Sequence, residues 1–599
     1  MCSSGRRRPS RRAFRTQKLY SERIDRPDDA LVGVTGPAPA RLRQYDEISS
    51  HLGIVEGATV ALIFLVVGLS FRAIGAPLLT LFAAGVAFEV SGGLIPWIGT
   101  RLGVTVPAEV EPLVVALTLG IVTDYAVFYL AGCRRRLLEG AGRLEAARTA
   151  TVRITPIVAT AGLIVVAGTA ALLVGELEFF RAFGPALAIT AAVSLVVAMT
   201  LVPAALGIFG RLLFWPGVRA SDLGRAGSER FSAPRREAAA RFVSSLPVSV
   251  VVVVLCTAAL VLAATGLRHT QLSFRLIDGL PSGTEEHRAA EAAGHGFAAG
   301  VLAPTVLLVE GQGLEARRAP LARLEDELEE EPGVAGVLGP REQILQVPKG
   351  VFVAPQGNAA RYVIIFEDSP LGALAIHDFR SLDDRLPELL RRAGLGGARA
   401  GLTGQTALAS QTVEAVIGSS VRVGAVVLAV NFVLLALFLR ALVAPLYLLA
   451  ASAASVAATL GLTTYVFQDL LGHGDLTYYV PFAVGVLLVS LGSDYNVYVV
   501  GRIWEELRER RLRDAIAVAV PRASKAISVA GIALAFSFAA LARVPLDGFR
   551  EFAVMMCVGV LIETFVVRTL LIPALISVFG RTSAWPGRIR RVGRARLTT

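Results

Sequence analysis

Eleven stretches of mostly apolar residues divide this 599-residue chain, and they constrain its fold more than any other feature. Each is close to the roughly 20 residues that a helix needs to cross the hydrocarbon core of a bilayer. Helices suit that environment because they satisfy their own backbone hydrogen bonds. We therefore predict an α-helical polytopic membrane protein. The predicted spans are 54–71, 76–97, 112–131, 154–175, 182–209, 247–266, 420–439, 443–467, 478–500, 526–541 and 550–579.

The composition agrees with a membrane protein. Hydrophobic residues make up 54% and charged residues 18% of the chain, and the mean hydropathy is +0.61. Soluble chains carry about 25% charge. The net charge of +11 comes largely from arginines between the apolar stretches, so we predict no nucleic-acid partner. The four cysteines are scattered and predict neither a disulfide framework nor a metal site, and we expect no cofactor.

Basic residues predict the orientation, because cytoplasmic loops carry an excess of Lys and Arg. If the C-terminus is cytoplasmic, so are 132–153, 210–246, 501–525 and 580–599, which hold 26 Lys and Arg. The short loops on the other side hold four, namely Arg101, Arg181, Arg543 and Arg550. We therefore predict a plasma-membrane protein with a cytoplasmic C-terminus and with 267–419 outside the cell.

Residues 267–419 are long enough to fold as a separate domain. β-rich runs and stretches of helical spacing alternate within this segment. The alternation predicts one small extracytoplasmic α/β unit of the βαββαβ type. Its predicted strands are 305–310, 362–367 and 398–403, and its predicted helices are 314–328 and 376–392.

An internal repeat covers much of the chain. A shift of 368 residues aligns Phe71-Arg72 with Leu439-Arg440. A shift of 370 then aligns the later marks, which are Asp124-Tyr125 with Asp494-Tyr495, Phe209-Gly210-Arg211 with Phe579-Gly580-Arg581, and Trp215-Pro216 with Trp585-Pro586. Each repeat brings five spans, and one further span lies between the repeats. The two helix bundles are therefore predicted to be parallel repeats about an axis along the membrane normal, an arrangement that transporters use.

Each repeat carries an aspartate in the middle of its third span, Asp124 or Asp494. An aspartate there costs about 2.5 to 3.5 kcal/mol on insertion scales unless it finds partners. Neighbouring helical residues point about 100° apart, so an aspartate cannot readily bond the tyrosine beside it. We therefore predict crossed contacts, from Tyr495 to Asp124 and from Tyr125 to Asp494. Supporting residues in these helices are Gly120, Thr123, Gly492, Ser493 and Asn496. The two glycines, with Thr123 and Ser493, are predicted to keep the seam between the two helices narrow.

Two interpretations of the aspartate pair remain open. The aspartates can be a proton relay, loaded and unloaded by a pH difference, or protonated groups that only lock the two halves together. Other polar residues in spans, Glu89, Asn431 and Glu563, are predicted to be helix-packing contacts. Glu563 and Arg568 are predicted to pair near the cytoplasmic end, with their charged groups reaching the membrane surface.

The doubled Asp-Tyr helices resemble the MMPL branch of the RND transporter superfamily. So do Tyr495-Asn496 with Arg502 behind it, and the segment Ile277-Asp278-Gly279-Leu280-Pro281. The resemblance extends over roughly residues 34 to 580. It implies a proton-driven exporter of lipids or other hydrophobic molecules, with the Asp-Tyr pairs as the relay and porter domains carrying the substrate.

The N-terminus departs from that family, whose members begin with a helix followed by a first porter domain. Residues 34–50 are predicted to be only the end of such a domain, and residues 1–26 hold nine Lys and Arg with no signal-peptide core. We expect a fragment, a mis-started reading frame or one half of a split protein. The predicted organisation is 1–50 basic segment and porter remnant, 51–210 first bundle, 211–246 basic linker, 247–266 first helix of the second repeat, 267–419 porter domain, 420–580 second bundle and 581–599 basic tail.

Three functions therefore compete. The leading one is export of a lipid or other hydrophobic substrate by protons that pass through Asp124 and Asp494. The alternatives are an auxiliary subunit of protein export from the same superfamily, and an inactive or split fragment. The expected partners are membrane lipids, the substrate and protons, and possible protein partners are a second copy or a separately encoded N-terminal half. Because no nucleophile, base and orienting residue occur together, we do not predict an enzyme.

Overall fold

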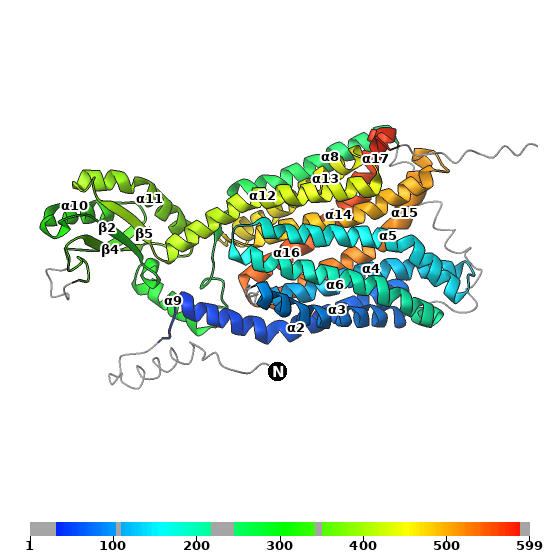
Figure 1. The fold of residues 1–599 in the computed structure, drawn as a ribbon, viewed down its shortest axis with the longest axis horizontal. Coiled ribbons are helices and arrows are strands. Elements are labelled where there is room, and N and C mark those ends of the chain that lie inside the picture. Colours follow the sequence, from blue (N-terminus) through cyan, green and yellow to red (C-terminus); the bar gives the residue numbers. More distant parts are fainter. Residues whose placement is uncertain (1–31, 103–109, 217–244, 342–349, 588–599) are drawn as a thin grey trace, which may run out of the picture.

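The computed structural model describes residues 32–102, 110–216, 245–341 and 350–587. Eleven helices in these ranges are long and apolar enough to cross a membrane, as the sequence predicts. They lie side by side in one bundle, and a small α/β domain projects from one end of it (Figure 1). The first 31 residues, most of the linker 211–246 and the end of the basic tail lie outside the described residues.

The first repeat consists of five spanning helices with short connections. A 3-10 turn, Ala171–Val174, extends α5, and Gly210–Phe214 follows α6 in the same way. The helices are α2 (Pro37–Phe71), α3 (Gly75–Leu102), α4 (Val110–Leu138), α5 (Arg143–Ala170) and α6 (Glu178–Phe209).

The second repeat begins with α8, after which the chain leaves the bundle and returns as five more spans. Two π-helical segments interrupt it, η9 (Tyr465–Leu470) and η11 (Ile562–Leu571). Its helices are α8 (Leu246–Ala264), α12 (Gln405–Leu439), α13 (Val443–Thr464), α14 (Val480–Leu507), α15 (Leu512–Ala539), α16 (Asp547–Leu561) and α17 (Ile572–Phe579).

The marks that reveal the repeat make equivalent contacts in both halves. Arg72 and Arg440 each end a helix with a left-handed backbone, with φ of 49° and 50°. The next residue forms a β-bridge to the repeated Pro in each half, Ala73 to Pro216 and Ala441 to Pro586. The parallel repeat is therefore a feature of the fold as well as of the sequence.

Helices α2 and α12 both begin well before the apolar runs that predict them. Helix α2 begins at Pro37, so residues 37–50 are helical and continuous with the first span. The predicted boundary at residue 51 thus falls inside a helix. The sequence does not show this because the first turns of α2 mix polar and apolar residues, and their apolar content does not differ from that of a soluble domain.

The segment between α8 and α12 contains the predicted βαββαβ unit. In chain order its elements are β2 (Thr305–Glu310), α10 (Arg318–Glu329), β3 (Val334–Leu338), β4 (Ala359–Phe366), α11 (Ala373–Ala393) and β5 (Arg399–Thr403). The strands form an antiparallel sheet in the order β3-β4-β2-β5, and both helices pack on it around a separate apolar core. Strand β3, which is short and contains a glycine, is the one element of the unit that the sequence did not predict.

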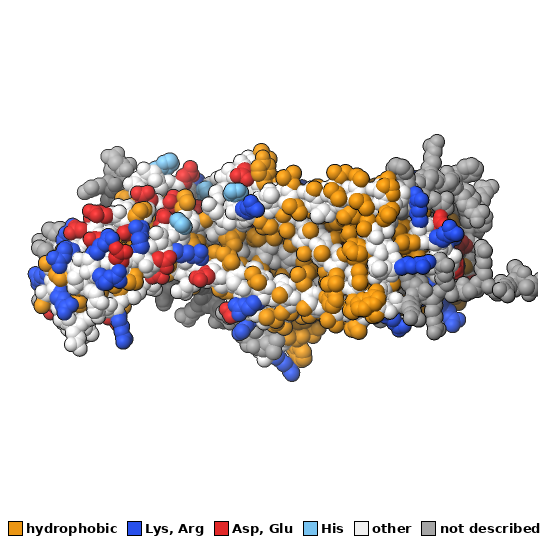
Figure 2. Space-filling model, turned by 90° about the horizontal axis from the view of Figure 1, so that it is seen from above, with side chains coloured by type: hydrophobic (Ala, Val, Ile, Leu, Met, Phe, Trp, Pro, Cys, Tyr) orange, Lys and Arg blue, Asp and Glu red, His pale blue; other side chains and the backbone are white. Residues whose placement is uncertain are grey.

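On the face shown in Figure 2, apolar side chains are spread over the bundle, and charged side chains gather on the α/β domain and at the opposite end. Lipid-facing positions account for large exposed hydrophobic side chains such as Phe82 and Leu262. An apolar surface of this size would promote aggregation in water, but it is suited to the hydrocarbon core of a bilayer. The two short strands β1 (Leu272–Ser273) and β6 (Leu476–Thr477) pair in parallel where the domain meets the bundle.

Candidate functional site

The two aspartate-bearing helices form the centre of the bundle. All of the apolar window of α4 and 88% of that of α14 are buried, against 17% for the peripheral α8. Neighbouring helices surround both. An ionisable residue at this depth faces protein and not lipid, which is where functional intramembrane charges occur.

Asp124 of α4 accepts a hydrogen bond from the hydroxyl of Tyr495 on α14. Both side chains are almost fully buried, at 1% and 2% exposure. The contact joins the two repeats, and Phe128 of α4 packs on Tyr495 beside it, with ring centroids 5.8 Å apart. The predicted crossed contact is confirmed for this aspartate. The side chain of Asp494 lies outside the described residues, so its contact with the buried Tyr125 stays a prediction.

Tyr495→Phe distinguishes this crossed pairing from a general effect on the bundle. Loss of the hydroxyl leaves a buried acceptor on Asp124 unsatisfied, at about 1 to 3 kcal/mol. In a double-mutant cycle on stability, Tyr495→Phe should couple with Asp124→Asn by about 0.5 kcal/mol or more, and much less with Asp494→Asn. Equal coupling with both aspartates would contradict the pairing, and the measurement does not require transport.

Two of the three polar supporting residues, Ser493 and Asn496, attach α14 to neighbouring helices. Thr123 Oγ1 donates to the Leu119 carbonyl oxygen of its own helix at 2.5 Å. Ser493 Oγ accepts from Asn431 Nδ2 of α12 at 3.5 Å, and Asn496 Nδ2 donates to Ser452 Oγ of α13 at 3.4 Å. Asn431 is therefore a helix-packing contact between α12 and α14, as predicted.

The glycines do not narrow the seam between α4 and α14, and that prediction is wrong. A Cβ on Gly120 would lie 2.4 Å from Leu534 Cδ1 of α15. A Cβ on Gly492 would lie 3.1 Å from the carboxyl of Glu563 on η11. The repeat shift in this part of the chain is 370 residues, but residues 120 and 492 are 372 residues apart. The two glycines therefore point in different directions on their helices. Each glycine allows the close approach of a different neighbouring segment, α15 at Gly120 and η11 at Gly492.

The pair Glu563 and Arg568 is also not where it was predicted. Both residues are only 4% exposed, and they lie inside the bundle instead of reaching the membrane surface. Arg568 Nε is 4.0 Å from Glu563 Oε1, and the Arg568 guanidinium carbon is 3.9 Å from the centroid of the Tyr495 ring. The π-helix η11 brings the two residues to the same side of the segment and turns them toward α14.

Comparison with known proteins identifies the chain. Its sequence matches the profile of the MMPL family over residues 12–250 and 278–597. The chain belongs to the MMPL family. This MMPL protein is 31% identical over 565 residues to a putative membrane protein of Streptomyces coelicolor, covering 94% of the chain and 65% of that relative. Thus it spans a little under two thirds of the relative's length.

Two further relatives have names that describe a transported substrate. The apo-petrobactin exporter of Bacillus anthracis is 26% identical over 544 residues, which cover 89% of the chain and 71% of the relative. The acyltrehalose exporter MmpL10 of Mycobacterium tuberculosis is 29% identical over 236 residues, 39% of the chain and 23% of the relative. These similarities are to transporters and support a general exporter role.

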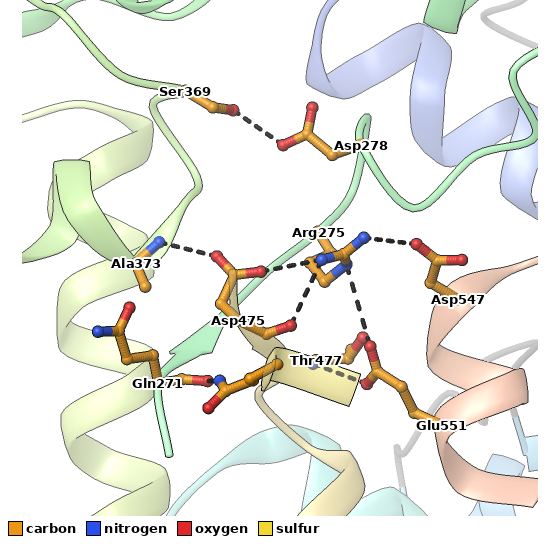
Figure 3. Close-up of polar contacts among 10 residues, drawn as sticks. Gln271, Arg275, Asp278, Ser369, Ala373, Asp475, Thr477, Asp547 and Glu551 are labelled. Atoms are coloured by element: carbon orange, nitrogen blue, oxygen red, sulfur yellow. Dashed lines mark hydrogen bonds and ion pairs between the residues drawn. The ribbon is translucent and has the colours of Figure 1, made fainter. Parts of the chain in front are cut away.

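A second polar cluster of this MMPL protein lies at the junction of the α/β domain with the bundle (Figure 3). Arg275 follows β1, and its guanidinium faces three carboxylates of the second bundle. Nη2 donates to Asp547 Oδ2 at 2.5 Å and Nη1 donates to Asp475 Oδ1 at 3.2 Å. Nε is 3.9 Å from Oε1 of Glu551, which is fully buried. No local pattern in the sequence indicates this cluster, because the partners are 200 or more residues apart.

The cluster also fixes the backbone around it. Asp475 Oδ2 accepts from the backbone amide of Ala373 in α11 at 3.0 Å, and Glu551 Oε2 accepts from that of Thr477 at 2.8 Å. Arg275 itself has φ of 38°, in the left-handed region that non-glycine residues rarely adopt. Such a conformation persists only where the surroundings over-determine it, so the junction is held firmly.

Charge at the junction perturbs two groups outside the spans. Burial tends to lower the pKa of Arg275, but the carboxylates of Asp547, Glu551 and Asp475 outweigh it and raise that pKa. For His473, burial and the nearby Arg275 charge lower the pKa. Neither effect is evident from the sequence. No group of three His, Cys, Asp or Glu residues suited to a metal ion occurs in the described ranges.

A cavity of about 340 Å³ opens beside the junction cluster. Its walls come from the first turns of α2, the chain after β1, the residues after β6 and the start of α16. Aromatic, aliphatic and charged side chains all line it, and Arg275 and Asp547 of the junction cluster are among them. The lining includes Tyr45, Phe274, Tyr478 and Phe549, with Arg41 and Asp547.

Proposed function

We propose that this MMPL protein exports a lipid or other amphipathic molecule across the plasma membrane and is driven by the proton-motive force. The observation that carries the proposal is the hydrogen bond from Tyr495 to Asp124, buried at the centre of the bundle and made between the two repeats. Tyr125 and Asp494 would form the reciprocal pair. A proton bound or released there changes a contact between the halves, which is the change that coupling requires.

The available energy is sufficient for transport. A proton that moves through about 100 mV supplies roughly 2.3 kcal/mol, and each pH unit adds about 1.4 kcal/mol. The relay helix α14 begins shortly after Thr477, whose amide bonds Glu551 of the junction cluster. Rearrangement of α14 would therefore reach the α/β domain through Arg275.

The chemistry of the cavity supports an amphipathic substrate. The aromatic and aliphatic side chains that line it can contact apolar groups, and Arg41, Arg275 and Asp547 can bind a polar head group and orient it. One relative is named as an exporter of acyltrehalose, an acylated sugar that combines apolar chains with a polar head. We propose that the substrate passes this cavity on its way into the α/β domain.

Flux in proteoliposomes tests the proposal. The purified chain is reconstituted with an imposed pH gradient, and export of an NBD-labelled phospholipid and of Nile red is followed by fluorescence. We expect the transport of at least one probe to rise with the gradient and to collapse when a protonophore is added. Transport that is indifferent to the gradient would remove the proton from the mechanism.

The proposed orientation has a separate test. Asp384→Cys in α11 and Glu509→Cys after α14 place thiols at exposed positions at opposite ends of the molecule. A membrane-impermeant maleimide added to intact cells should label the first and spare the second until the cells are lysed, with the unsubstituted chain as background. The reverse pattern would overturn the extracytoplasmic placement of the α/β domain.

A further inference from the structure

The cavity beside the junction contains a cation that is not neutralised by its neighbours. Three charged side chains line this cavity, Arg41, Arg275 and Asp547. Arg275 donates to Asp547 at 2.5 Å and faces two further carboxylates, so these two residues satisfy each other (Figure 3). Arg41 forms no hydrogen bond or ion pair within the part of the chain that the structure describes. Its charge is therefore available to a molecule in the cavity.

Helix α2 carries Arg41 on a face that changes from polar to apolar toward the membrane. Arg41, Gln44, Tyr45 and Ile48 all line the cavity, and their spacing of three or four residues places them on one side of the helix. Arg41 is exposed, whereas Ile48 is only 2% exposed. The apolar run of α2 starts at residue 54, so Ile48 lies nearer to the bilayer and Arg41 about 10 Å further out along the helix axis.

The lining nearest the bundle is apolar. It includes Leu280 after β1, Tyr479 before α14, and Leu546 and Phe549 at the start of α16, each at most 7% exposed. The volume of about 340 Å³ is near the lower end of the roughly 300 to 1,000 Å³ typical of ligand pockets. The cavity therefore suits one hydrocarbon chain with a head group better than a lipid with several chains.

The second repeat shows that helix packing does not account for the cation. At the repeat shift of 368, Arg41 corresponds to Ala409 and Tyr45 to Val413, both on α12. Those two residues are buried and pack with Leu371 and Ile376 of the α/β domain. The same face of the entry helix is thus apolar and covered in one half, but carries a cation at a cavity in the other half.

We propose that the cavity binds single-chain amphiphiles with an anionic head group, and that Arg41 selects them by pairing with that group. A guanidinium binds a carboxylate or a phosphate through two parallel N–H···O bonds, which an uncharged head group cannot match in strength. The chain lies against the apolar lining, with the head group directed away from the membrane. The inference rests on the proposed passage of an amphipathic substrate through this cavity, and it names the class of that substrate.

The binding of two fluorescent probes to the whole chain tests this selectivity without any transport. The chain is reconstituted in phosphatidylcholine nanodiscs, with empty nanodiscs as the background. Dansyl-aminoundecanoic acid, which is ionised at neutral pH, is titrated beside its primary amide, which has the same chain and no charge. We expect the acid to bind about tenfold more tightly than the amide. Arg41→Gln should remove this preference and leave the affinity for the amide unchanged, and Arg41→Lys should retain part of it.

Arg43→Gln is the matched control, because it removes an equal charge two residues away on the same helix. Arg43 pairs with Glu47 at 2.8 Å and is not among the residues that line the cavity. This variant should bind both probes as the unsubstituted chain does. Gln44→Trp places a large side chain in the cavity and should weaken the binding of both probes.

Two results would overturn the inference. One is a preference for the acid that survives Arg41→Gln, and the other is binding of both probes that is unaffected by Gln44→Trp. The flux experiment in proteoliposomes fails separately, because transport that is indifferent to the pH gradient would contradict the proposed function and leave the preference of the cavity for an anionic head group intact.

Discussion

Asp124→Asn is expected to abolish proton-coupled transport while leaving the protein folded and inserted in the membrane. Asparagine keeps the volume of the side chain and can still accept the Tyr495 hydrogen bond, but it cannot exchange a proton. Transport of the fluorescent probes should therefore fall to the level of empty vesicles at any pH gradient. We expect the same of Asp494→Asn, its counterpart in the second repeat.

Glu111→Gln is the matched control for this prediction, because Glu111 begins the same helix α4 but is exposed. It should transport normally. Expression and thermal stability in detergent separate lost coupling from lost folding. Gradient-driven export by Asp124→Asn at normal expression would leave the aspartates with only a structural role.

Most of the membrane fold is predictable from the sequence because its signals are local or periodic. Eleven apolar runs predicted eleven spans, and the constant spacing of repeated marks such as Trp215-Pro216 and Trp585-Pro586 predicted two equivalent bundles. The crossed contact of Asp124 was also predictable, because helix geometry excludes a bond between adjacent residues. The predictions that failed concern the direction in which a side chain points from its helix and the contacts between distant parts of the chain.

Glu563 and Arg568 illustrate the failure. Five residues apart and near a helix end, they have the pattern of side chains that extend to the membrane surface. Nothing in their spacing shows that the helix becomes a π-helix at Ile562 and turns both charges inward. The roles of Gly120 and Gly492 were misjudged for a related reason, since a difference of two residues in register rotates a glycine to another neighbour.

Arg275→Met is expected to produce the largest loss of stability at the junction. The substitution keeps an unbranched side chain but removes the cation that faces Asp475, Asp547 and Glu551. Three carboxyl groups would then lie together without a cation, with Glu551 fully buried. Removing one partner of a buried ion pair typically costs about 3 to 5 kcal/mol. We expect a marked fall in thermal stability and cleavage by protease in the chain between β1 and α9 (Glu285–Gly296).

The control and the rescue follow from the same electrostatics. Arg422→Met removes an exposed partner of Glu176, 2.6 Å away, and should change neither stability nor proteolysis measurably, because water screens that pair. Adding Glu551→Gln to Arg275→Met removes the most deeply buried of the three carboxyl groups and should recover part of the loss, since an amide oxygen can still accept from the Thr477 amide. If Arg275→Met is as stable as Arg422→Met, the carboxylates hold the junction without their cation. If the double variant is no better than Arg275→Met, the loss comes from packing and not from the unpaired carboxyl group of Glu551.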